Sequence, residues 1–491
     1  MLSEASKKEE THPGETSYLA LLVRRYSPFS SEMDSEQSEK KEVAVSPPVS
    51  LTPVSDSNDK LDLPTVTQNV EVQKLVTSSP QDVDPRSPAP RTPRQLRVSR
   101  ISYTSLCFIL FLGGWNDGAT GTLLPRIREV YEDSYILVSL IFVSACFGFL
   151  AGSVINLHLT PWLGFGKSLF FGSLLQVVAY AIQAAAPPYP LFVICYAISG
   201  CGFAIQDAHA NGFVAQMKQR GEAAKMGGLH ACYGLGLFIS PLVSTQFAQI
   251  PRWSFHFLVS LGLALMSTTA LLCIFKLRSL DVCLVAAGET PPEKSSSERS
   301  LFGQVMRSKE AHLLAVFVIA HLGVVVTISG WIVTFIIEVR GGGPTSGYIS
   351  AGVSAGSMLG RIALLWINKK VGERNVIFLY SAIVIAMEFV IWFVPSLIGN
   401  AVAVCFAGLC LGPMYPLAVN QAKRILPGHM LTGVIGWMAG FGQTGSALLP
   451  FMTGAIASKH GLQSMPPLLV GMTVLMMGIW ALVPATPRRS G

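Results

Sequence analysis

The chain has 491 residues, of which 50% are hydrophobic and only 13% are charged, and its mean hydropathy is +0.47. An average soluble domain carries about 25% charged residues, so the composition argues against a soluble enzyme and predicts a protein that crosses the membrane repeatedly. The net charge of +7 comes without a basic and aromatic module, which argues against a nucleic-acid partner.

Residues 1–100 differ from the rest of the chain, because they are rich in Ser, Pro, Glu, Lys and Asp and poor in aromatic residues. Such a segment cannot bury enough apolar surface to offset the entropy lost on ordering. We therefore predict a disordered cytoplasmic tail over 1–100. Its Ser-Pro and Thr-Pro steps, Ser79 and Thr92 among them, are candidate phosphorylation sites, although an ordinary solvated linker explains any one of them as well.

From Ile101 onward, the chain contains twelve apolar stretches long enough to cross the membrane, which takes about 20 residues in a helix. The predicted spans are 102–124, 136–157, 167–186, 190–216, 226–250, 253–276, 311–338, 346–367, 375–394, 397–422, 431–457 and 465–484. A polar loop, 277–310, divides them into an N-terminal half (101–276) and a C-terminal half (311–485), and 486–491 form a short tail. The nine cysteines show no CxxC pair, and we predict no metal site and no cofactor.

Lys and Arg predict the orientation of the spans. With the N-terminus in the cytoplasm, 21 of these residues lie on the inner flanks and 5 on the outer flanks. Cytoplasmic loops carry the excess of Lys and Arg, so both termini and the loop 277–310 are expected in the cytoplasm. The predicted location is the plasma membrane or the vacuolar membrane.

The two halves share a pattern of small residues. The second span reads FGFLAG and the eighth reads AGSMLGR, so both carry glycines four residues apart. The fifth span contains GLG and the eleventh GFG, each followed by a proline, and a Gly-Trp pair occurs in spans one and seven. Two six-span halves related by an axis along the membrane normal predict the fold class, an all-α membrane protein with the major facilitator fold.

An aspartate, Asp117, lies within the first span in the stretch GGWNDGATG. A charged side chain at mid-membrane costs about 2.5–3.5 kcal/mol on insertion scales, which makes an accidental placement uncommon. We interpret Asp117 as a proton-binding group. The alternative is that it caps a break in the helix or pairs with a neighbour to fix packing.

Two further titratable residues complete a predicted proton-coupling set. Asp207 lies in the fourth span, with Asn211 four residues later on the same helical face. His230 lies in the fifth span, and imidazole changes charge near neutral pH. The alternative for a lone membrane histidine is a hydrogen-bonded packing role.

Polar and aromatic side chains of the spans are predicted to bind the substrate, because they form hydrogen bonds and stack around a small polar molecule. The set is Trp115, Asn116, His209, Asn211, Asn420, Trp437 and Gln443. The alternative for each is a hydrogen bond between helices. Glu338, at the outer end of the seventh span, is expected to form a surface pair with Arg340, and Glu388 is assigned no role.

Gly360 and Arg361 precede the basic loop NKKVGER and look like the gating signature of major facilitators. The corresponding position of the N-terminal half holds Asn156, where that family usually has an aspartate. A neutral residue there weakens a charge clamp on the inner gate of that half.

Four stretches, GWNDGATGTLLPRI, KKVGERNVIFLYS, LGPMYPLAVNQAKRILP and TGVIGWMAGFGQTGSALLPFMTG, resemble fungal major facilitator proteins of the bypass-of-stop-codon type and, more distantly, fucose–proton symporters. The resemblance covers about residues 100–485 and implies transmembrane transport. In the symporters, acids of the first and fourth spans are linked to proton coupling and sugar binding. Asp117 and Asp207 lie on the matching spans.

We predict a monomeric secondary transporter that moves a small organic solute, a sugar or related metabolite, together with protons by alternating access. The chain has no GxxxxGK[ST] loop and no Ser/His/Asp, metal or phosphate-binding constellation, so neither ATP drive nor an enzyme is predicted. The alternative function is a nutrient sensor in the membrane that does not transport and signals through the N-terminal tail.

Overall fold

Long helices make up almost all of the described chain. The computed structural model describes residues 91–217, 222–291 and 298–486. The first six long helices are α1 (Pro93–Tyr131), α2 (Tyr135–Leu163), α3 (Phe165–Ala184), α4 (Tyr189–Ala215), α5 (Glu222–Ala248) and α6 (His256–Phe275). After α7 (Leu280–Ala286) and α8 (Glu298–Arg307) come α9 (Lys309–Arg340), α10 (Tyr348–Ala363), α11 (Leu365–Val371), α12 (Glu373–Phe393), α13 (Leu397–Leu411), α14 (Met414–Ile425), α15 (Leu431–His460) and α16 (Met465–Leu482). Short 3₁₀ turns, η3 (Pro344–Gly347) among them, connect some of these helices.

Each of the twelve predicted spans has a helical counterpart. Within the described ranges, ten helices are long and apolar enough to cross a membrane, and the bent pair formed by η3–α10 and α11 makes eleven. The remaining counterpart is α15, which has 30 residues but many glycines and polar side chains that lower its hydropathy. The predicted all-α class therefore holds for the described chain, and the strongly polar span is the one that faces other helices most.

Two predicted boundaries differ from the structure. Helix α1 begins at Pro93, so residues 93–100 of the predicted tail belong to the first helix, which starts with a capping box between Thr92 and Gln95. The predicted loop 277–310 contains α7 and α8, and Arg91 forms a buried ion pair with Glu289 just after α7. Residues 1–90, 292–297 and 487–491 of the predicted tails and loop lie outside the described residues.

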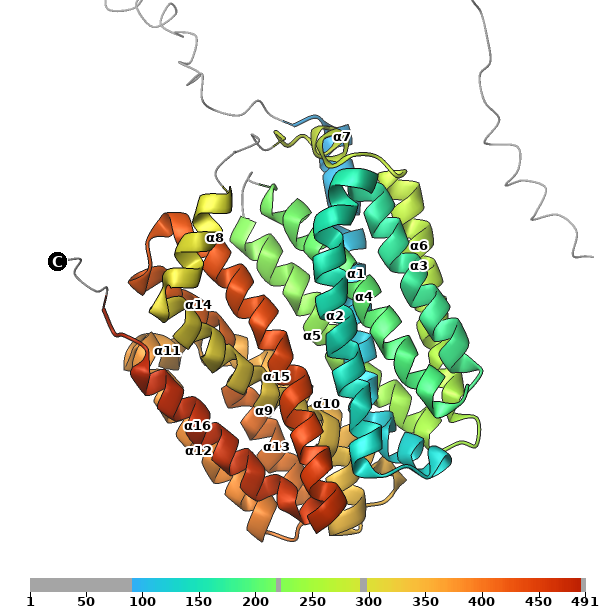
Figure 1. Cartoon of the computed structure of the whole chain (residues 1–491), viewed down its shortest axis with the longest axis vertical. Helices are drawn as coiled ribbons and strands as arrows, with labels where there is room; N and C mark the ends of the chain where they lie inside the picture. The colour runs from blue at the N-terminus through green and yellow to red at the C-terminus, as the bar shows by residue number, and fades with distance from the viewer. Residues whose placement is uncertain (1–90, 218–221, 292–297, 487–491) are drawn as a thin grey trace, which may run out of the picture. The chain divides into compact units, whose positions relative to one another are not determined.

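The helices of the N-terminal half lie on one side of the bundle and those of the C-terminal half on the other (Figure 1). Within the first half, α1 packs on α5 and α2 packs on α4. Within the second half, α9 packs on α15 and α10 packs on α13, which are the equivalent pairs of a six-span repeat. The halves meet where α2 contacts α15, α5 contacts α10 and α1 contacts α9.

Glycines mark these equivalent helix crossings. A Cβ atom on Gly148 of α2 would lie 2.0 Å from the carbonyl oxygen of Ala197, and one on Gly356 of α10 would lie 2.2 Å from that of Cys405. Because only glycine leaves room for such an approach, the repeated glycines of the sequence correspond to the α2–α4 and α10–α13 contacts. The repeat seen in the sequence is thus a repeat of packing surfaces.

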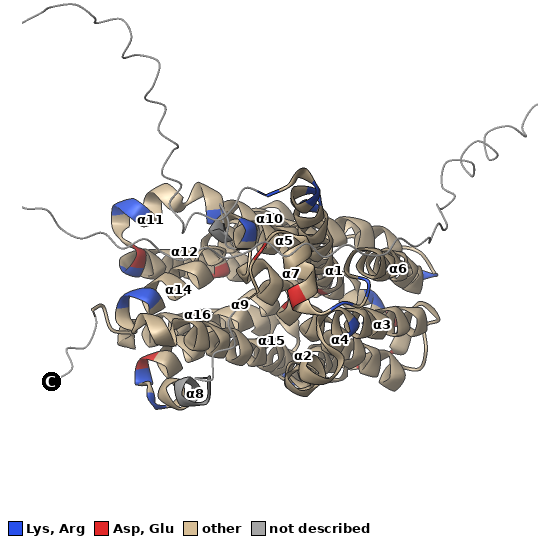
Figure 2. Cartoon of the chain, turned by 90° about the horizontal axis from the view of Figure 1, so that it is seen from above, with Lys and Arg blue, Asp and Glu red and all other residues tan. Residues whose placement is uncertain are grey.

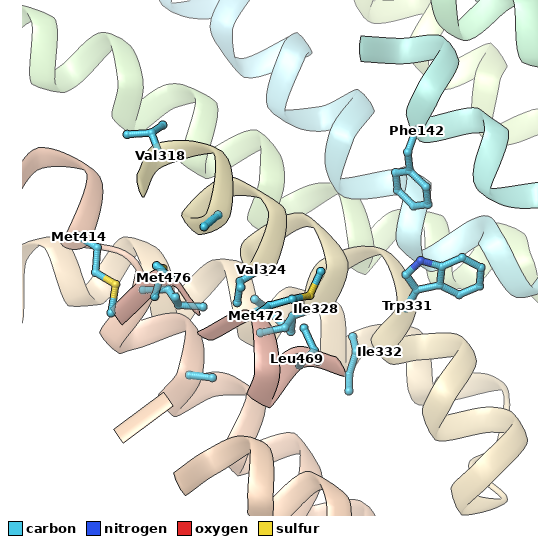
Figure 3. Packing of buried hydrophobic residues seen from close by; sticks show 14 of the residues in the cluster. Phe142, Val318, Val324, Ile328, Trp331, Ile332, Met414, Leu469, Met472 and Met476 are labelled. Carbon is cyan, nitrogen blue, oxygen red and sulfur yellow. The ribbon is translucent and has the colours of Figure 1, made fainter. Parts of the chain in front are cut away.

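The largest buried cluster follows α9, the helix at the centre of the C-terminal half. Figure 3 shows Phe142 of α2 directed toward Trp331 of α9, and Ile328 of α9 beside Met472 of α16. Trp331 is fully buried, and its Nε1 donates a hydrogen bond to the carbonyl oxygen of Pro450 at 3.0 Å. These contacts attach α9 to α15 and α16 and also place it against the N-terminal half.

Candidate functional site

Asp117 is a solvent-exposed carboxylate in the middle of a membrane-spanning helix. Its neighbours Trp115 and Gly118 are buried, whereas Asp117 itself is exposed. The hydroxyl of Tyr233 on α5 donates a hydrogen bond to Asp117 Oδ2 at 2.6 Å. Helices α1 and α5 approach closely at this level, because a Cβ on Gly114 would lie 2.0 Å from the carbonyl oxygen of Tyr233. The glycine therefore brings the tyrosine within reach of the acid.

The Tyr233 hydroxyl lies between charged groups of both halves. It interacts electrostatically with Asp117, with Asp207 of α4 and with Arg361 of α10. Asp207 is half-buried, and its Oδ1 accepts a hydrogen bond from Asn211 Nδ2 at 2.8 Å. The ring of Tyr233 stacks on Phe203 of α4, with ring centroids 6.3 Å apart. Tyr233 therefore connects the two acids to each other and to the facing half.

Arg361 supplies the positive charge of this region. Its side chain is exposed, and its Nε donates a hydrogen bond to the carbonyl oxygen of Gly412 at 3.3 Å. Within the described ranges no carboxylate lies at ion-pair distance from it. Arg361 interacts electrostatically with His230 of α5, which is also exposed, and with the buried His321 of α9.

We call Asp117, Asp207, His230, Tyr233 and Arg361 the central cluster. The structure brings together all three residues of the predicted proton-coupling set, and their roles stay a prediction. Sequence analysis missed Tyr233, which directly precedes the GLG motif of α5 and lies one turn after His230. That position on the glycine face was the available signal, since the same face packs against α1.

Three of the predicted substrate-binding residues lie in or beside the central cluster. Asn116 is the neighbour of Asp117, and Asn211 bonds to Asp207. Gln443 lies on α15 where the halves meet, since Cys146 Sγ of α2 donates a hydrogen bond to its carbonyl oxygen at 3.2 Å. The half-buried side chains of these three residues remain candidates for contact with a solute.

The structure does not bring Trp115 and His209 to the central cluster. Trp115 is buried, stacks on His256 and donates from Nε1 to Ser260 Oγ of α6 at 2.9 Å. His209 is buried beside Thr160 of α2, whose hydroxyl lies 3.3 Å from its Nε2. Both side chains join helices within the N-terminal half, as the alternative interpretation stated.

Asn420 and Trp437 also serve contacts between helices. Asn420 Nδ2 donates to Glu373 Oε1 at 3.2 Å, which connects α14 to the start of α12. Trp437 Nε1 donates to His312 Nδ1 at 3.2 Å, which connects α15 to the start of α9. Hydrophobic pattern and residue type could not separate these contacts from substrate binding, because both need a half-buried polar group.

The predicted gating residues take different places. Gly360 lies at the crossing of α10 and α13, where a Cβ would lie 1.9 Å from the carbonyl oxygen of Leu409. Asn156 accepts a hydrogen bond from the Thr160 hydroxyl at 2.9 Å and so belongs to a chain that reaches His209 of α4. Arg361 belongs to the central cluster. A gating role for the three is still a prediction.

Comparison with known proteins bears on the family of the chain. The family model described as "Major Facilitator Superfamily" matches residues 106–450, which is more than half of the chain. The chain belongs to the major facilitator superfamily. This confirms the predicted fold class and the multi-pass membrane location, and it makes a transporter, rather than an enzyme, the function consistent with the family.

This major facilitator protein has relatives of known sequence. It is 24% identical over 409 residues to Bypass of stop codon protein 6 of Saccharomyces cerevisiae, with 77% of this chain and 81% of that protein covered. It is 18% identical over 363 residues to the glucose/mannose transporter GlcP of Bacillus subtilis, with 74% and 89% covered. The predicted resemblance to the bypass-of-stop-codon group is confirmed.

Solved structures share the fold of this facilitator. The nucleoside transporter NupG aligns with a TM-score of 0.65 at 10% identity, covering 78% of this chain and 99% of that chain. A D-xylose–proton symporter aligns with a TM-score of 0.61 at 13% identity, covering 79% and 98%. The fucose–proton symporter FucP of E. coli aligns with a TM-score of 0.55 at 13% identity, covering 79% and 100%.

The two halves of the facilitator are joined by a charged latch where α1 and α9 end. Glu338 of α9 accepts a hydrogen bond from Arg128 of α1 at 2.6 Å and another from the Tyr135 hydroxyl of α2. The Arg128 guanidinium also lies 4.0 Å from the centroid of the Tyr135 ring. The expected pair of Glu338 with Arg340 is wrong, because Arg340 turns to the carbonyl oxygen of Ile391 at 2.7 Å.

Further bonds between the halves lie at the same end of the bundle, which we call the closed end. The backbone N–H of Ile136 donates to Ser458 Oγ at 2.9 Å, and Gln246 bonds to the Tyr348 hydroxyl. Beyond the latch lies a pocket of about 850 Å³ lined by residues of both halves, including Thr122 and Gln249. Of the hydrogen bonds between the halves given for the described residues, only that from Cys146 lies elsewhere, nearer the middle of the bundle. The opposite end, where α1 begins, we call the open end.

Substituting Glu338 by glutamine should loosen the closed end. The amide keeps the size of the side chain but loses the charge that Arg128 and Tyr135 donate to, and a hydrogen bond to a charged group contributes about 1.5–3 kcal/mol. We expect about tenfold faster labelling, by an impermeant thiol reagent, of a cysteine introduced at Thr122 beneath the latch. The chain without the introduced cysteine measures the background of the nine native thiols.

The matched control for the latch is Glu129→Gln. Glu129 pairs with Arg126 three residues earlier on the same helix, at the same end but within one half. We expect no change in the labelling rate for this variant. A Glu338→Gln chain that labels no faster than the control would show that the latch does not hold the halves together.

Proposed function

We propose that this chain is a proton-coupled symporter that moves a small organic solute by alternating access. The proposal is carried by one observation, an exposed carboxylate at the centre of a membrane-spanning helix, bonded to a tyrosine that faces charges of both halves. Acids inside a membrane are typical of proton pathways. The names of the similar structures, proton symporters of fucose and xylose among them, support a neutral sugar or related metabolite as the solute.

The proposed orientation puts the open end in the cytoplasm. Figure 2 looks onto the bundle from the side of α7, α8 and α11 and shows Lys and Arg on α8, α11 and α14. Cytoplasmic surfaces of membrane proteins carry this excess of positive charge. In this orientation the latch at Glu338 closes the outer end, the central cluster is reached from the cytoplasm, and both termini are cytoplasmic. The membrane is the plasma or vacuolar membrane, and the chain acts as a monomer.

Protonation would rearrange the hydrogen bonds of the central cluster. An ionised Asp117 only accepts hydrogen bonds, and Tyr233 supplies one of them. A protonated Asp117 can donate from one oxygen, which frees the Tyr233 hydroxyl to bond to the solute or to Asp207. His230 assists by exchanging protons with the cytoplasm. Binding of proton and solute would then be linked through a single hydroxyl group.

Closure of the open end would bring Arg361 toward the acids of the other half. In the present conformation Arg361 has only the carbonyl oxygen of Gly412 as a hydrogen-bond acceptor among the described residues. Rocking of the halves about the central cluster shortens the separation between α10 and α5, which already contact each other. We assign Arg361 the inner gate on this basis, with Gly360 fixing α10 to α13 and Asn156 holding α2 to α4.

The comparisons give no support to the alternative function of a membrane nutrient sensor. The predicted signalling segment, residues 1–90, lies outside the described residues. Deleting it separates the two functions, since a transporter should keep its flux and a sensor should lose its output.

Flux measurements in proteoliposomes test the proposed function. The purified chain is given an inward proton gradient and a panel of labelled hexoses, pentoses, nucleosides and small organic acids. We expect at least one neutral solute to accumulate above its external concentration and to be released when a protonophore collapses the gradient. Flux that is independent of the proton gradient for every solute on the panel would overturn proton coupling.

Replacing Tyr233 by phenylalanine should uncouple the two acids. The ring still packs on Phe203, but the hydrogen bond to Asp117 is lost, so we expect at least about a tenfold loss of gradient-driven uptake. Tyr103→Phe is the matched control, because its hydroxyl also joins α1 to α5, by a 2.8 Å hydrogen bond to the carbonyl oxygen of Lys225. Equal uptake by both variants would remove Tyr233 from the mechanism.

A further inference from the structure

A basic corner lies at the open end, where α11, the start of α12 and the end of α14 meet. Its cationic residues are Lys369, Lys370, Arg374, Lys423 and Arg424. Glu373 is the acidic residue among them, and it is engaged by Arg424 at 3.2 Å and by Asn420. Arg374 donates to the carbonyl oxygen of Val483 at 2.9 Å. Among the described residues, Lys369 and Lys370 have no carboxylate partner.

Helix α11 presents these two lysines on an outward face. It is bent by 55° from the preceding η3–α10 segment. Its inward side is fixed by Asn368, which is buried and accepts a hydrogen bond from the Tyr380 hydroxyl at 2.5 Å. On the other side Trp366 is 67% exposed, and Lys370 Nζ lies 4.8 Å from the centroid of its ring. The helix is thus held from within and combines an exposed aromatic ring with two exposed ammonium groups.

This combination fits one occupant. Exposed tryptophan rings of membrane proteins lie at the boundary between headgroups and acyl chains, where both an apolar face and a polar edge are satisfied. Lysines placed at that level attract anionic headgroups, and basic clusters beside a membrane-spanning helix are typical of such sites. Leu365, which is 53% exposed next to Trp366, extends the apolar surface toward the acyl chains.

The equivalent corner of the N-terminal half is a natural comparison. There Trp162 is 81% exposed at the end of α2, and Lys167 follows in α3. The aromatic anchor is therefore common to both halves, whereas the lysine doublet is present only on α11. A general attraction of the basic end for lipid would use both corners, but a headgroup site needs the doublet.

We propose that α11 binds an anionic phospholipid, with the headgroup phosphate between Lys369 and Lys370 and the acyl chains along Leu365 and Trp366. The proposal rests on the membrane orientation proposed above and not on proton coupling. Because α11 continues from α10, which carries Arg361, a bound lipid would hold the bend between the two helices. The rate of transport is then expected to rise with the anionic lipid content of the membrane.

Lipid binding to the purified full-length chain tests this site. Native mass spectrometry measures the retention of phosphatidylserine and of phosphatidylcholine in detergent micelles. We expect the wild-type chain to retain phosphatidylserine preferentially. The double variant Lys369→Gln, Lys370→Gln should bind it about tenfold or more weakly, because each lysine near an anionic surface contributes to the attraction. The charge-retaining variant Lys369→Arg, Lys370→Arg should keep the binding.

Lys167→Gln is the matched control, and it should retain phosphatidylserine as the wild type does. Equal retention of the two lipids by the wild type, or unchanged binding in the double glutamine variant, would overturn the site on α11. An equal loss in the Lys167→Gln variant would overturn it too, since binding would then belong to the whole basic end. Unfolding temperatures measured without phosphatidylserine should match, as both lysines are exposed and lack carboxylate partners. Binding is measured without flux, so an uncoupled chain that still binds the lipid overturns only the proposed function.

Discussion

Replacing Asp117 by asparagine should abolish accumulation driven by a proton gradient and leave exchange between preloaded pools partly intact. The amide has the shape of the protonated carboxyl and still accepts the hydrogen bond of Tyr233, but it cannot bind and release a proton. Accumulation requires the proton to be released on the inner side, whereas exchange only requires the loaded halves to rock. The two fluxes are measured in the same proteoliposomes with the solute found in the panel.

Glu388→Gln is the control for this experiment. Glu388 is also an acid within the membrane, but it is fully buried in α12 and accepts a hydrogen bond from the Thr473 hydroxyl at 2.8 Å, within the C-terminal half. We expect this variant to accumulate the solute as the wild type does. Unchanged accumulation by the Asp117→Asn chain would remove the proton role of Asp117, and with it the proposed mechanism.

Replacing Gly360 by alanine should destabilise the C-terminal half strongly. The added Cβ would lie 1.9 Å from the carbonyl oxygen of Leu409, and backbone cannot move aside as a flexible side chain can. Helices α10 and α13 must separate, and overpacking of this kind costs about 1–3 kcal/mol. We expect a lower unfolding temperature and a smaller monodisperse fraction after detergent extraction.

Gly436→Ala provides the comparison. Gly436 lies within α15 and its Cβ would meet nothing within 4 Å, so the substitution adds helix propensity without a clash. We expect the yield and unfolding temperature of this variant to equal or exceed those of the wild type. If the two alanine variants behave alike, the α10–α13 crossing is looser than the structure indicates.

The positions of the membrane spans followed from sequence because hydropathy is a local property. A stretch of about 20 apolar residues must become a helix in lipid, whatever its neighbours are. The same holds for the glycines at Gly148 and Gly356, since small residues at a spacing of four form a flat helix face. The boundaries were less predictable. Pro93 starts α1 through a local capping box, which hydropathy does not detect.

The partners of polar side chains did not follow from sequence. Helical periodicity gives the angle of a side chain around its own axis, but not the helix that it faces. Trp115 and Asp117 are two residues apart on α1, and one is buried against α6 while the other is exposed beside α5. Glu338 bonds to Arg128, 210 residues away, instead of the nearby Arg340.

The amino-acid sequence by itself determined that this chain crosses the membrane as two repeated halves, and that Asp117 and Asp207 lie within it. Composition, glycine spacing and the cost of an intramembrane charge depend on neighbouring residues of the chain alone. Only the tertiary structure decided that Tyr233 bonds to Asp117, that Arg361 faces the acids from the other half, and that Glu338 latches the closed end. Each of these contacts joins helices that are distant in sequence, and their meeting depends on how all the helices pack together.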